Sequence, residues 1–317
     1  MATISCFTTA FNLVKNGYPF VESILSILPI CDEFLVLEAY SDDNTYDILR
    51  KIEGKCKKFK VYREEKLSGE ADKVLRTLAN SIRRRCSKEY ILFVQANEVF
   101  HDSTARYIRK LPDIYPNAAL FPFSYLHLLG DVKFREEWRI MFAKNVKYVE
   151  AIDDAWTLGL SKNFIIRKAL MAPIMPRTFI SYLYWGINYK FGLNPAINGN
   201  SVAVHLPHPV FRYYSVYPSD LFNKIESHIR LGLLGKDFQN FIFENQKENS
   251  YHKIFDNYIR LFKNKFGLPL SDYGEEFKYV KEENHPQLMK FFIDDLNKNP
   301  HDKYHIRENL YDLIPCD

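Results

Sequence analysis

The stretch Tyr90–Asp102, YILFVQANEVFHD, changes character where a strand would end. Its apolar part, Ile91–Val94, carries no charge, which is typical of a strand buried on both faces of a parallel sheet. The polar segment Gln95–Glu98 follows at once. Ligands of open parallel sheets bind beyond the carboxyl ends of the strands. This segment is therefore a candidate site, with two amides and one carboxylate.

The residues upstream repeat the order of strand, polar loop and helix. Strands are expected at residues 2–11, 33–37, 59–62 and 89–94, with helices at 18–28, 45–55 and 70–85. This alternation predicts an α/β fold, a mainly parallel sheet with helices on both faces. The loops after the first, second and fourth strands should meet at one edge of it.

The pattern changes beyond residue 103. Strands are expected at 118–125, 139–143 and 201–205, a loop at 153–162, and partial helix at 164–188. After the proline-punctuated run HLPHPVFRYY, amphipathic helices dominate residues 218–313. We expect two domains, an α/β domain over residues 1–215 and a helical extension over residues 216–317 packed on it.

The composition is that of a soluble globular protein of 317 residues, 47% hydrophobic and 26% charged. A net charge of +4 permits an anionic ligand without requiring one. The five cysteines show no metal-binding spacing, which favours reduced thiols. Neither a signal peptide nor a membrane span is expected, so the predicted location is cytoplasmic or peripheral to a membrane.

The loop after the second strand, LEAYSDDNTYDIL (Leu37–Leu49), is the second candidate segment. A carboxylate at a strand end, here Glu38, can accept hydrogen bonds from a base or a ribose hydroxyl. The alternative for Ser41–Asn44 is capping of the next helix, which explains Glu38 less well. For Gln95–Glu98 the alternative is a turn with polar side chains facing water.

Three segments in order, ISCFTTAFN, SILPICDEFLVLEAYSDDNT and LANSIRRRCSKEYILFVQANEVF, resemble the N-terminal half of family 2 glycosyltransferases of the GT-A fold. The resemblance covers about the first 125 residues and rests on the order of its motifs. It implies a nucleotide-diphosphate sugar as ligand. In that family an acidic residue ends the second strand, an Ala-Arg-Asn helix follows, and the fourth strand ends in Asp-x-Asp.

The predicted donor-binding residues are Thr9, Phe11, Asn12, Glu38, Asp43, Asn80, Gln95, Ala96, Asn97, Arg212 and Lys224. Among them, the resemblance implies Glu38, Asp43, Asn80 and the segment Gln95–Asn97. Gln95 and Asn97 stand where the family has its two aspartates, and amides cannot neutralise a cation. Weak or absent dependence on Mn²⁺ or Mg²⁺ is therefore expected, with Asn97, Glu98 and His205 as candidate ligands. Without a metal, a departing diphosphate needs protein cations, for which Arg212 and Lys224, helped by His205, His208 or His228, are candidates.

The segments FPFSYLHLLGD and FREEWRIMFAKNVKYVEAIDDAW resemble the acceptor half of the same family. Inverting transfer needs a carboxylate that takes the proton of the acceptor hydroxyl. Asp153 and Asp154 are the expected catalytic bases, with Glu136 and Glu137 in reserve. The alternative is a solvated charge cluster, because structural ion networks imitate sites.

The predicted function is therefore an inverting glycosyltransferase that acts on a glycan or lipid acceptor. A catalytically degraded nucleotide- or sugar-binding module is one alternative. A glycosyltransferase acting on modified bases in DNA is another, because the basic runs SIRRRC and RYIRK could contact phosphates. Such runs are usually solvated helix faces.

Overall fold

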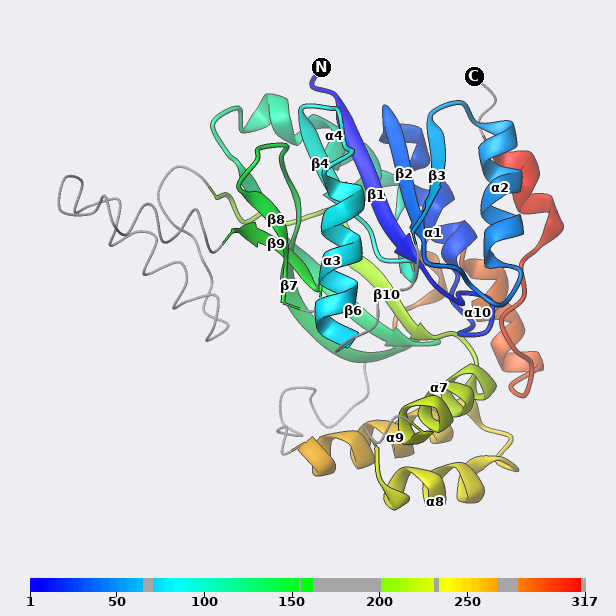
Figure 1. The fold of residues 1–317 in the computed structure, drawn as a ribbon. Helices are drawn as coiled ribbons and strands as arrows, with labels where there is room; N and C mark the ends of the chain where they lie inside the picture. The colour runs from blue at the N-terminus through cyan, green and yellow to red at the C-terminus, as the bar shows by residue number, and fades with distance from the viewer. Residues whose placement is uncertain (65–70, 154, 162–200, 231–233, 267–278, 315–317) are drawn as a thin grey trace.

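The computed structural model describes the chain except for residues 65–70, 154, 162–200, 231–233, 267–278 and 315–317. Within the described part, eight strands form one sheet in the order β3-β2-β1-β4-β7-β6-β10-β5, and β8 and β9 form a second, two-stranded sheet (Figure 1). The strands are β1 (Ile4–Ala10), β2 (Glu33–Glu38), β3 (Phe59–Arg63), β4 (Tyr90–Phe93), β5 (Glu98–Val99), β6 (Leu120–Leu129), β7 (Val132–Lys144), β8 (Val149–Ile152), β9 (Thr157–Leu160) and β10 (Val210–Ser215).

The main sheet is mostly parallel. Strands β1 to β4 are parallel neighbours, β6 and β10 are parallel to each other, and β7 and β5 run antiparallel to the strands beside them. Ala10 of β1 pairs with Glu38 of β2, and Phe7 of β1 pairs with Phe93 of β4. The carboxyl ends of these three strands therefore lie at one edge, and the predicted α/β fold is confirmed.

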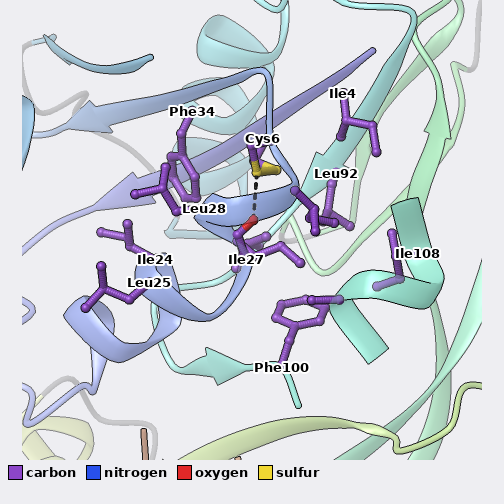
Figure 2. Packing of buried hydrophobic residues seen from close by; sticks show 14 of the residues in the cluster. Ile4, Cys6, Ile24, Leu25, Ile27, Leu28, Phe34, Leu92, Phe100 and Ile108 are labelled. Atoms are coloured by element: carbon purple, nitrogen blue, oxygen red, sulfur yellow. Dashed lines mark hydrogen bonds between the residues drawn. A yellow bond between two sulfur atoms is a disulfide. The ribbon is translucent and has the colours of Figure 1, made fainter. Parts of the chain in front are cut away.

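Helices cover both faces of this sheet. They are α1 (Phe20–Ile27), α2 (Thr45–Lys55), α3 (Ala71–Arg83) and α4 (Asp102–Ile114), with the short 3₁₀ helix η1 (Leu28–Ile30) after α1. Successive residues of a strand point to opposite faces. Cys6 of β1 accordingly packs in a cluster with α1 and α4 (Figure 2), whereas Phe7 packs with α3 and β8.

The C-terminal region is helical, as predicted. It contains α7 (Pro218–Arg230), α8 (Lys236–Asn245), α9 (Tyr251–Phe266), α10 (Lys290–Lys298) and the 3₁₀ helices η3 (Glu282–Asn284) and η4 (Glu308–Leu313). Helices α7 to α9 lie together below the sheet in Figure 1. Their apolar faces form a cluster with side chains of β6 and β10, such as Leu128 and Tyr213. Leu310 of η4 joins the α1 cluster instead, so the chain returns to the sheet near its end. The boundary at residue 215 stays a prediction.

Several expected elements differ from the structure. Strand β9 lies inside the expected loop 153–162, and β10 runs through the proline-punctuated segment. The expected strand at 201–205 is reduced to isolated bridges of Ser201 and Val204 with β6. The expected partial helix at 164–188 lies outside the described residues. Strand β9 has too few residues to show a period and pairs with the nearby β8, whereas β10 is paired with β5 and β6, which are distant in the sequence.

The expectation of reduced thiols is wrong for two of the five cysteines. Cys6 and Cys31 form a disulfide with their Cα atoms 5.9 Å apart (Figure 2), while Cys56 and Cys86 are free and buried. The pair is separated by 25 residues, and the crossover from β1 through α1 to β2 brings it together. No helix in the described ranges is long and apolar enough to cross a membrane.

Candidate functional site

The polar loops after β1 and β2 meet at the carboxyl edge of the sheet, as the sequence predicts. The backbone N–H of Asn12 donates to Ser41 Oγ at 2.9 Å, and Asn12 Oδ1 accepts from the N–H of Asp42 at 2.9 Å. Asn12 has a φ of 51°, in the left-handed region that asparagine tolerates better than most residues. Asn12 thus joins the two loops, and its role in nucleotide binding stays a prediction.

Glu38 ends β2 with a fully buried carboxylate. Its Oε2 pairs with Arg63 Nε at 2.6 Å, and its Oε1 accepts from the N–H of Ser41 at 2.5 Å. The Arg63 guanidinium lies 4.2 Å from the ring centroid of Tyr40 and 3.9 Å from that of Tyr46. Both Glu38 oxygens therefore hold this loop, and Tyr40, 51% exposed, presents an aromatic ring at the same edge.

Asp43 makes the capping contacts that the sequence leaves open as an alternative. Its Oδ1 accepts from the N–H of Thr45 and its Oδ2 from the N–H of Lys15, both at 2.9 Å. Three other predicted donor-binding residues are partly buried near this edge, namely Thr9, Phe11 and Ala96. Asp43 therefore has a structural role that is independent of any ligand.

Asn80 is buried and forms two hydrogen bonds with the backbone of Ala151 in β8. Its Nδ2 donates to the carbonyl oxygen at 2.9 Å, and its Oδ1 accepts from the N–H at 2.8 Å. Because both ends of the amide are used, Asn80 fastens α3 to β8. It thereby supports the turn that carries Asp153, whereas its predicted contact with the nucleotide stays a prediction.

Glu98 is fully buried, and its carboxylate accepts three hydrogen bonds. Oε2 accepts from the N–H of Gln95 at 2.8 Å, and Oε1 accepts from the Tyr125 hydroxyl at 2.7 Å and from Arg139 Nη1. Both side chains of the Glu98–Arg139 ion pair are buried. Removing one partner of such a pair leaves an uncompensated buried charge. Glu98 is therefore first of all the counter-ion of Arg139.

The predicted metal ligands do not fit a divalent cation in this arrangement. Mn²⁺ and Mg²⁺ prefer several hard oxygen ligands. Glu98 is neutralised by Arg139, Asn97 Nδ2 donates to the carbonyl of Tyr213 at 3.1 Å, and His205 is exposed. Within the described ranges, no three or more His, Cys, Asp or Glu side chains are placed to hold a metal ion.

Gln95 connects the end of β4 to the turn after β8. Its Nε2 donates to the carbonyl of Ala155 at 3.4 Å, and its Oε1 is buried without a hydrogen-bond partner. Asp153 and Ala155 have φ values of 55° and 63°, a conformation that is uncommon for residues other than glycine. Asp153 is exposed and Asp154 lies outside the described residues, so the base assignment remains a prediction.

Two arginines lie over the Trp156 ring that follows this turn. The guanidinium carbon of Arg139 is 5.1 Å from the ring centroid, and that of Arg212 is 4.8 Å from it. The Nε and Nη2 atoms of Arg139 and the Nε of Arg212 are buried without a hydrogen-bond partner. Each unpaired buried donor costs about 1–3 kcal/mol. An acceptor from a ligand could satisfy them.

Lys224 of α7 adds a third positive charge. Its Nζ donates to the carbonyl of Tyr214 at 3.0 Å and lies 4.9 Å from the ring centroid of Tyr18. Burial by itself would raise the pKa of Tyr18, but the charges of Lys224 and Arg212 outweigh burial and lower that pKa. We call Arg139, Arg212 and Lys224 the cationic cluster.

The reserve base Glu137 is already paired. Its Oε1 is 2.7 Å from His127 Nε2 and its Oε2 is 2.7 Å from Arg135. Burial would raise the pKa of Glu137, but its bond to His127 and the nearby positive charges lower it. Burial lowers the pKa of His127 to about 4, and Arg212 contributes to that shift. A carboxylate with a lowered pKa is a weak base, which disfavours Glu137; Glu136 is exposed.

Two further histidines were expected to face a diphosphate. His208 lies against α4 instead, with its ring centroid 3.9 Å from that of His101 and its carbonyl accepting from Thr104. The pKa of His228 is lowered by burial and by Lys224, which places it within reach of the cluster's charge.

Sequence reasoning missed Arg139 and Tyr18 as site residues. The signal for Arg139 was a single charge immediately before the apolar run Ile140–Ala143 of β7. A charge in a buried strand needs a partner, and Glu98 supplies it. Tyr18 carried no comparable signal.

No family model and no curated protein matches this chain. Among solved structures, S. aureus TarS 1-349 in complex with UDP-GlcNAc matches 96% of this chain and 95% of that chain, at 12% identity and a TM-score of 0.40. A longer S. aureus TarS chain is matched over 52% of its length and 94% of this chain, at 11% identity and a TM-score of 0.40. This chain thus spans about half of that longer protein.

A second similar structure is glucosyl-3-phosphoglycerate synthase from Mycobacterium tuberculosis in complex with Mg²⁺ and UDP. It is matched over 69% of its length and 65% of this chain, at 14% identity and a TM-score of 0.34.

Proposed function

We propose that this protein is a glycosyltransferase that moves a sugar from a nucleotide-diphosphate sugar to an acceptor hydroxyl, with inversion at the anomeric carbon. The observation that carries this proposal is the cationic cluster with its unpaired buried donors. Two of its members, Arg139 and Arg212, lie over the ring of Trp156. Trp156 directly follows Ala155, whose carbonyl accepts a hydrogen bond from Gln95 at the end of β4. The resemblance of the N-terminal segments to family 2 glycosyltransferases supports the same function.

In the proposed reaction the nucleotide lies along the loops of Asn12 and Tyr40, and the diphosphate meets Arg212 and Lys224. The acceptor oxygen attacks the anomeric carbon while the bond from that carbon to the diphosphate oxygen breaks. The nucleoside diphosphate leaves with the bonding electrons, and fixed positive charge stabilises it. Asp153 or Asp154 takes the proton of the acceptor hydroxyl. No step is assigned to Mn²⁺ or Mg²⁺, because the predicted ligands do not fit one.

A catalytically inactive nucleotide- or sugar-binding module is the second candidate. It is favoured by one observation: the buried carboxylates Glu38 and Glu98 are both already paired with arginines of the chain. In such a module the cationic cluster would bind the same ligand without transfer.

The test is an assay of nucleotide release from UDP-GlcNAc, UDP-glucose and other nucleotide sugars, in EDTA and in Mn²⁺. Glycan, lipid and modified-DNA acceptors are supplied in turn, and NMR reports the anomeric configuration of the product. We expect turnover in EDTA and an inverted product. Binding without turnover under every condition would favour the module, and absence of both binding and turnover would overturn both candidates. A DNA acceptor would also show affinity that falls steeply with salt.

A further inference from the structure

The sheet edge around Trp156 holds more positive than negative charge. Glu98 pairs with Arg139, and Glu137 forms its own ion pair with Arg135. In the part of the chain that the structure describes, Arg212 and Lys224 form no ion pair with a carboxylate. Buried charges that lack a partner are unfavourable. The excess positive charge therefore calls for an anion.

Neighbouring groups respond to this excess. Arg212 contributes to lowering the pKa of Tyr18, of His127 and of Glu137; burial, the largest single influence on each, adds to the lowering for His127 and opposes it for Tyr18 and Glu137. Tyr18 lies in the loop before α1, His127 in β6 and Glu137 in β7, so the charge of Arg212 acts on groups from three parts of the chain. Burial would lower the pKa of Arg212 itself, but Tyr125 and Glu98 favour its cation and raise that pKa.

Arg139 is oriented within this field. Its Nη1 is bound to Glu98, and the Tyr125 hydroxyl and the Gln95 N–H hold that carboxylate in turn. Aromatic rings also enclose the guanidinium, which lies 5.2 Å from the Phe93 ring centroid and 5.5 Å from that of Tyr125. Nε and Nη2 remain as unpaired donors. A guanidinium held in this way can donate its Nε–H and Nη2–H to a phosphate group once the side chains that bury these two atoms move aside.

We propose that Arg139 is an internal cation of this site and binds the diphosphate group of the ligand together with Arg212. It acts at the strand end where the resemblance places a metal-binding Asp-x-Asp. Glu98 orients Arg139 and partly neutralises its charge, so this carboxylate limits the affinity for the anion. The nucleotide part of the ligand rests on the proposed function, whereas the diphosphate chemistry rests on the residues themselves.

The first test measures binding of inorganic pyrophosphate and of UDP by calorimetry in EDTA. We expect the wild type to bind both, and Arg139→Lys to weaken binding tenfold or more, because lysine loses the paired donors. Arg109→Lys is the matched control, since Arg109 pairs with Asp32 at 2.5 Å near α4, away from Trp156. Binding that requires Mn²⁺, or an equal loss of affinity in Arg139→Lys and Arg109→Lys, would overturn the proposal.

The second test uses Glu98→Gln, which removes the negative charge and keeps the size of the side chain. We expect pyrophosphate to bind roughly threefold to tenfold more tightly, because Arg139 is no longer neutralised. A purely structural role of the pair predicts unchanged or weaker binding, so that result would also refute the proposal. Where Arg139→Lys is too unstable to assay, this variant and the EDTA experiment decide.

The two proposals fail separately. Suppose that pyrophosphate binds without metal, that Arg139→Lys and Glu98→Gln change this binding as expected, and that no nucleotide sugar is turned over. The inference about Arg139 would then stand, and the proposed transferase activity would be refuted. Turnover that depends on Mn²⁺ and is unchanged in Arg139→Lys would support the transferase activity and refute the inference about Arg139.

Discussion

The Tyr304 hydroxyl donates to Glu22 Oε2 at 2.6 Å, across 282 positions of the chain. The backbone N–H of Tyr304 also donates to Asp220 Oδ2 at 3.0 Å. Both carboxylates are buried, so the C-terminal segment is attached to α1 and α7 through two buried acids. Asp220 further packs on Gly17, where an added Cβ would lie 2.5 Å from the carboxyl group at a φ of 61°. This arrangement fixes the loop that leads to Tyr18.

Because of these two buried acids, we expect the free energy of unfolding to fall as the pH rises. Burial raises the pKa of Glu22 from 4.5 to about 7 and that of Asp220 from 3.8 to about 7. The folded state thus binds more protons than the unfolded state between these values. This contribution to the free energy of unfolding is fully present below about pH 4 and is lost as the pH rises to about 7. The loss is roughly 3 to 4 kcal/mol per group. Urea unfolding from pH 4 to 8 measures it.

Glu22→Gln separates the contribution of Glu22. Glutamine stays neutral, so the free energy of unfolding of the variant should change less between pH 4 and 8 than that of the wild type. The difference should be about the contribution of one acid. Tyr304 can still donate to the amide oxygen. Asp220→Asn gives the corresponding comparison for the second acid. A wild-type stability that rises between pH 4 and 7, or an unchanged slope in both variants, would contradict this prediction.

Asn80→Ala should destabilise the fold more than it affects the ligand. The substitution leaves the buried N–H and carbonyl of Ala151 without their partner, at a cost of about 1–3 kcal/mol for each group. Denaturant unfolding measures the loss, and calorimetry with UDP measures binding at a temperature where the variant is folded. A stable variant that loses only nucleotide binding would instead support the role that the family resemblance implies.

The first half of the fold follows from the sequence to within one or two residues for most elements. Strand β2 and helix α2 are examples, because a continuous apolar run and a capped amphipathic segment are local signals. The short strands β8, β9 and β10 have no such signal. Strands β8 and β9 pair with each other and contact α3 and β7, and β10 pairs with β6; the sequence does not identify these elements as neighbours.

The convergence of the loops at the sheet edge was also predictable, because parallel topology alone determines it. The partners of the buried acids were not. Arg63 lies 25 positions from Glu38, and Arg139 lies 41 positions from Glu98 on a strand that runs antiparallel to β4. The sequence therefore indicated two free carboxylates where the structure has two neutralised ones.

Asn97→Asp tests whether the strand end can be turned into a metal site. An added carboxylate should tighten Mn²⁺ binding, which isothermal titration measures directly. The aspartate cannot donate to the carbonyl of Tyr213, so the melting temperature should fall by a few degrees. Asn97→Ala controls for the lost hydrogen bond. If Asn97→Asp binds Mn²⁺ no better than the alanine variant, the segment has no latent capacity for a metal.

Asp153→Asn tests the proposed base with a residue that suits the backbone conformation of the turn. Asparagine tolerates the left-handed backbone that Asp153 adopts at a φ of 55°, whereas alanine there would add strain. If Asp153 takes the proton of the acceptor, kcat should fall by about 10²-fold or more while binding of UDP is unchanged.

Asp154→Asn is made in parallel, because either residue could be the base, and Asp47→Asn on the exposed side of α2 is the control. The acid limb of the wild-type pH–rate profile should disappear only in the variant that lacks the base. Full activity in both Asp153→Asn and Asp154→Asn would require the proton acceptor to be sought elsewhere.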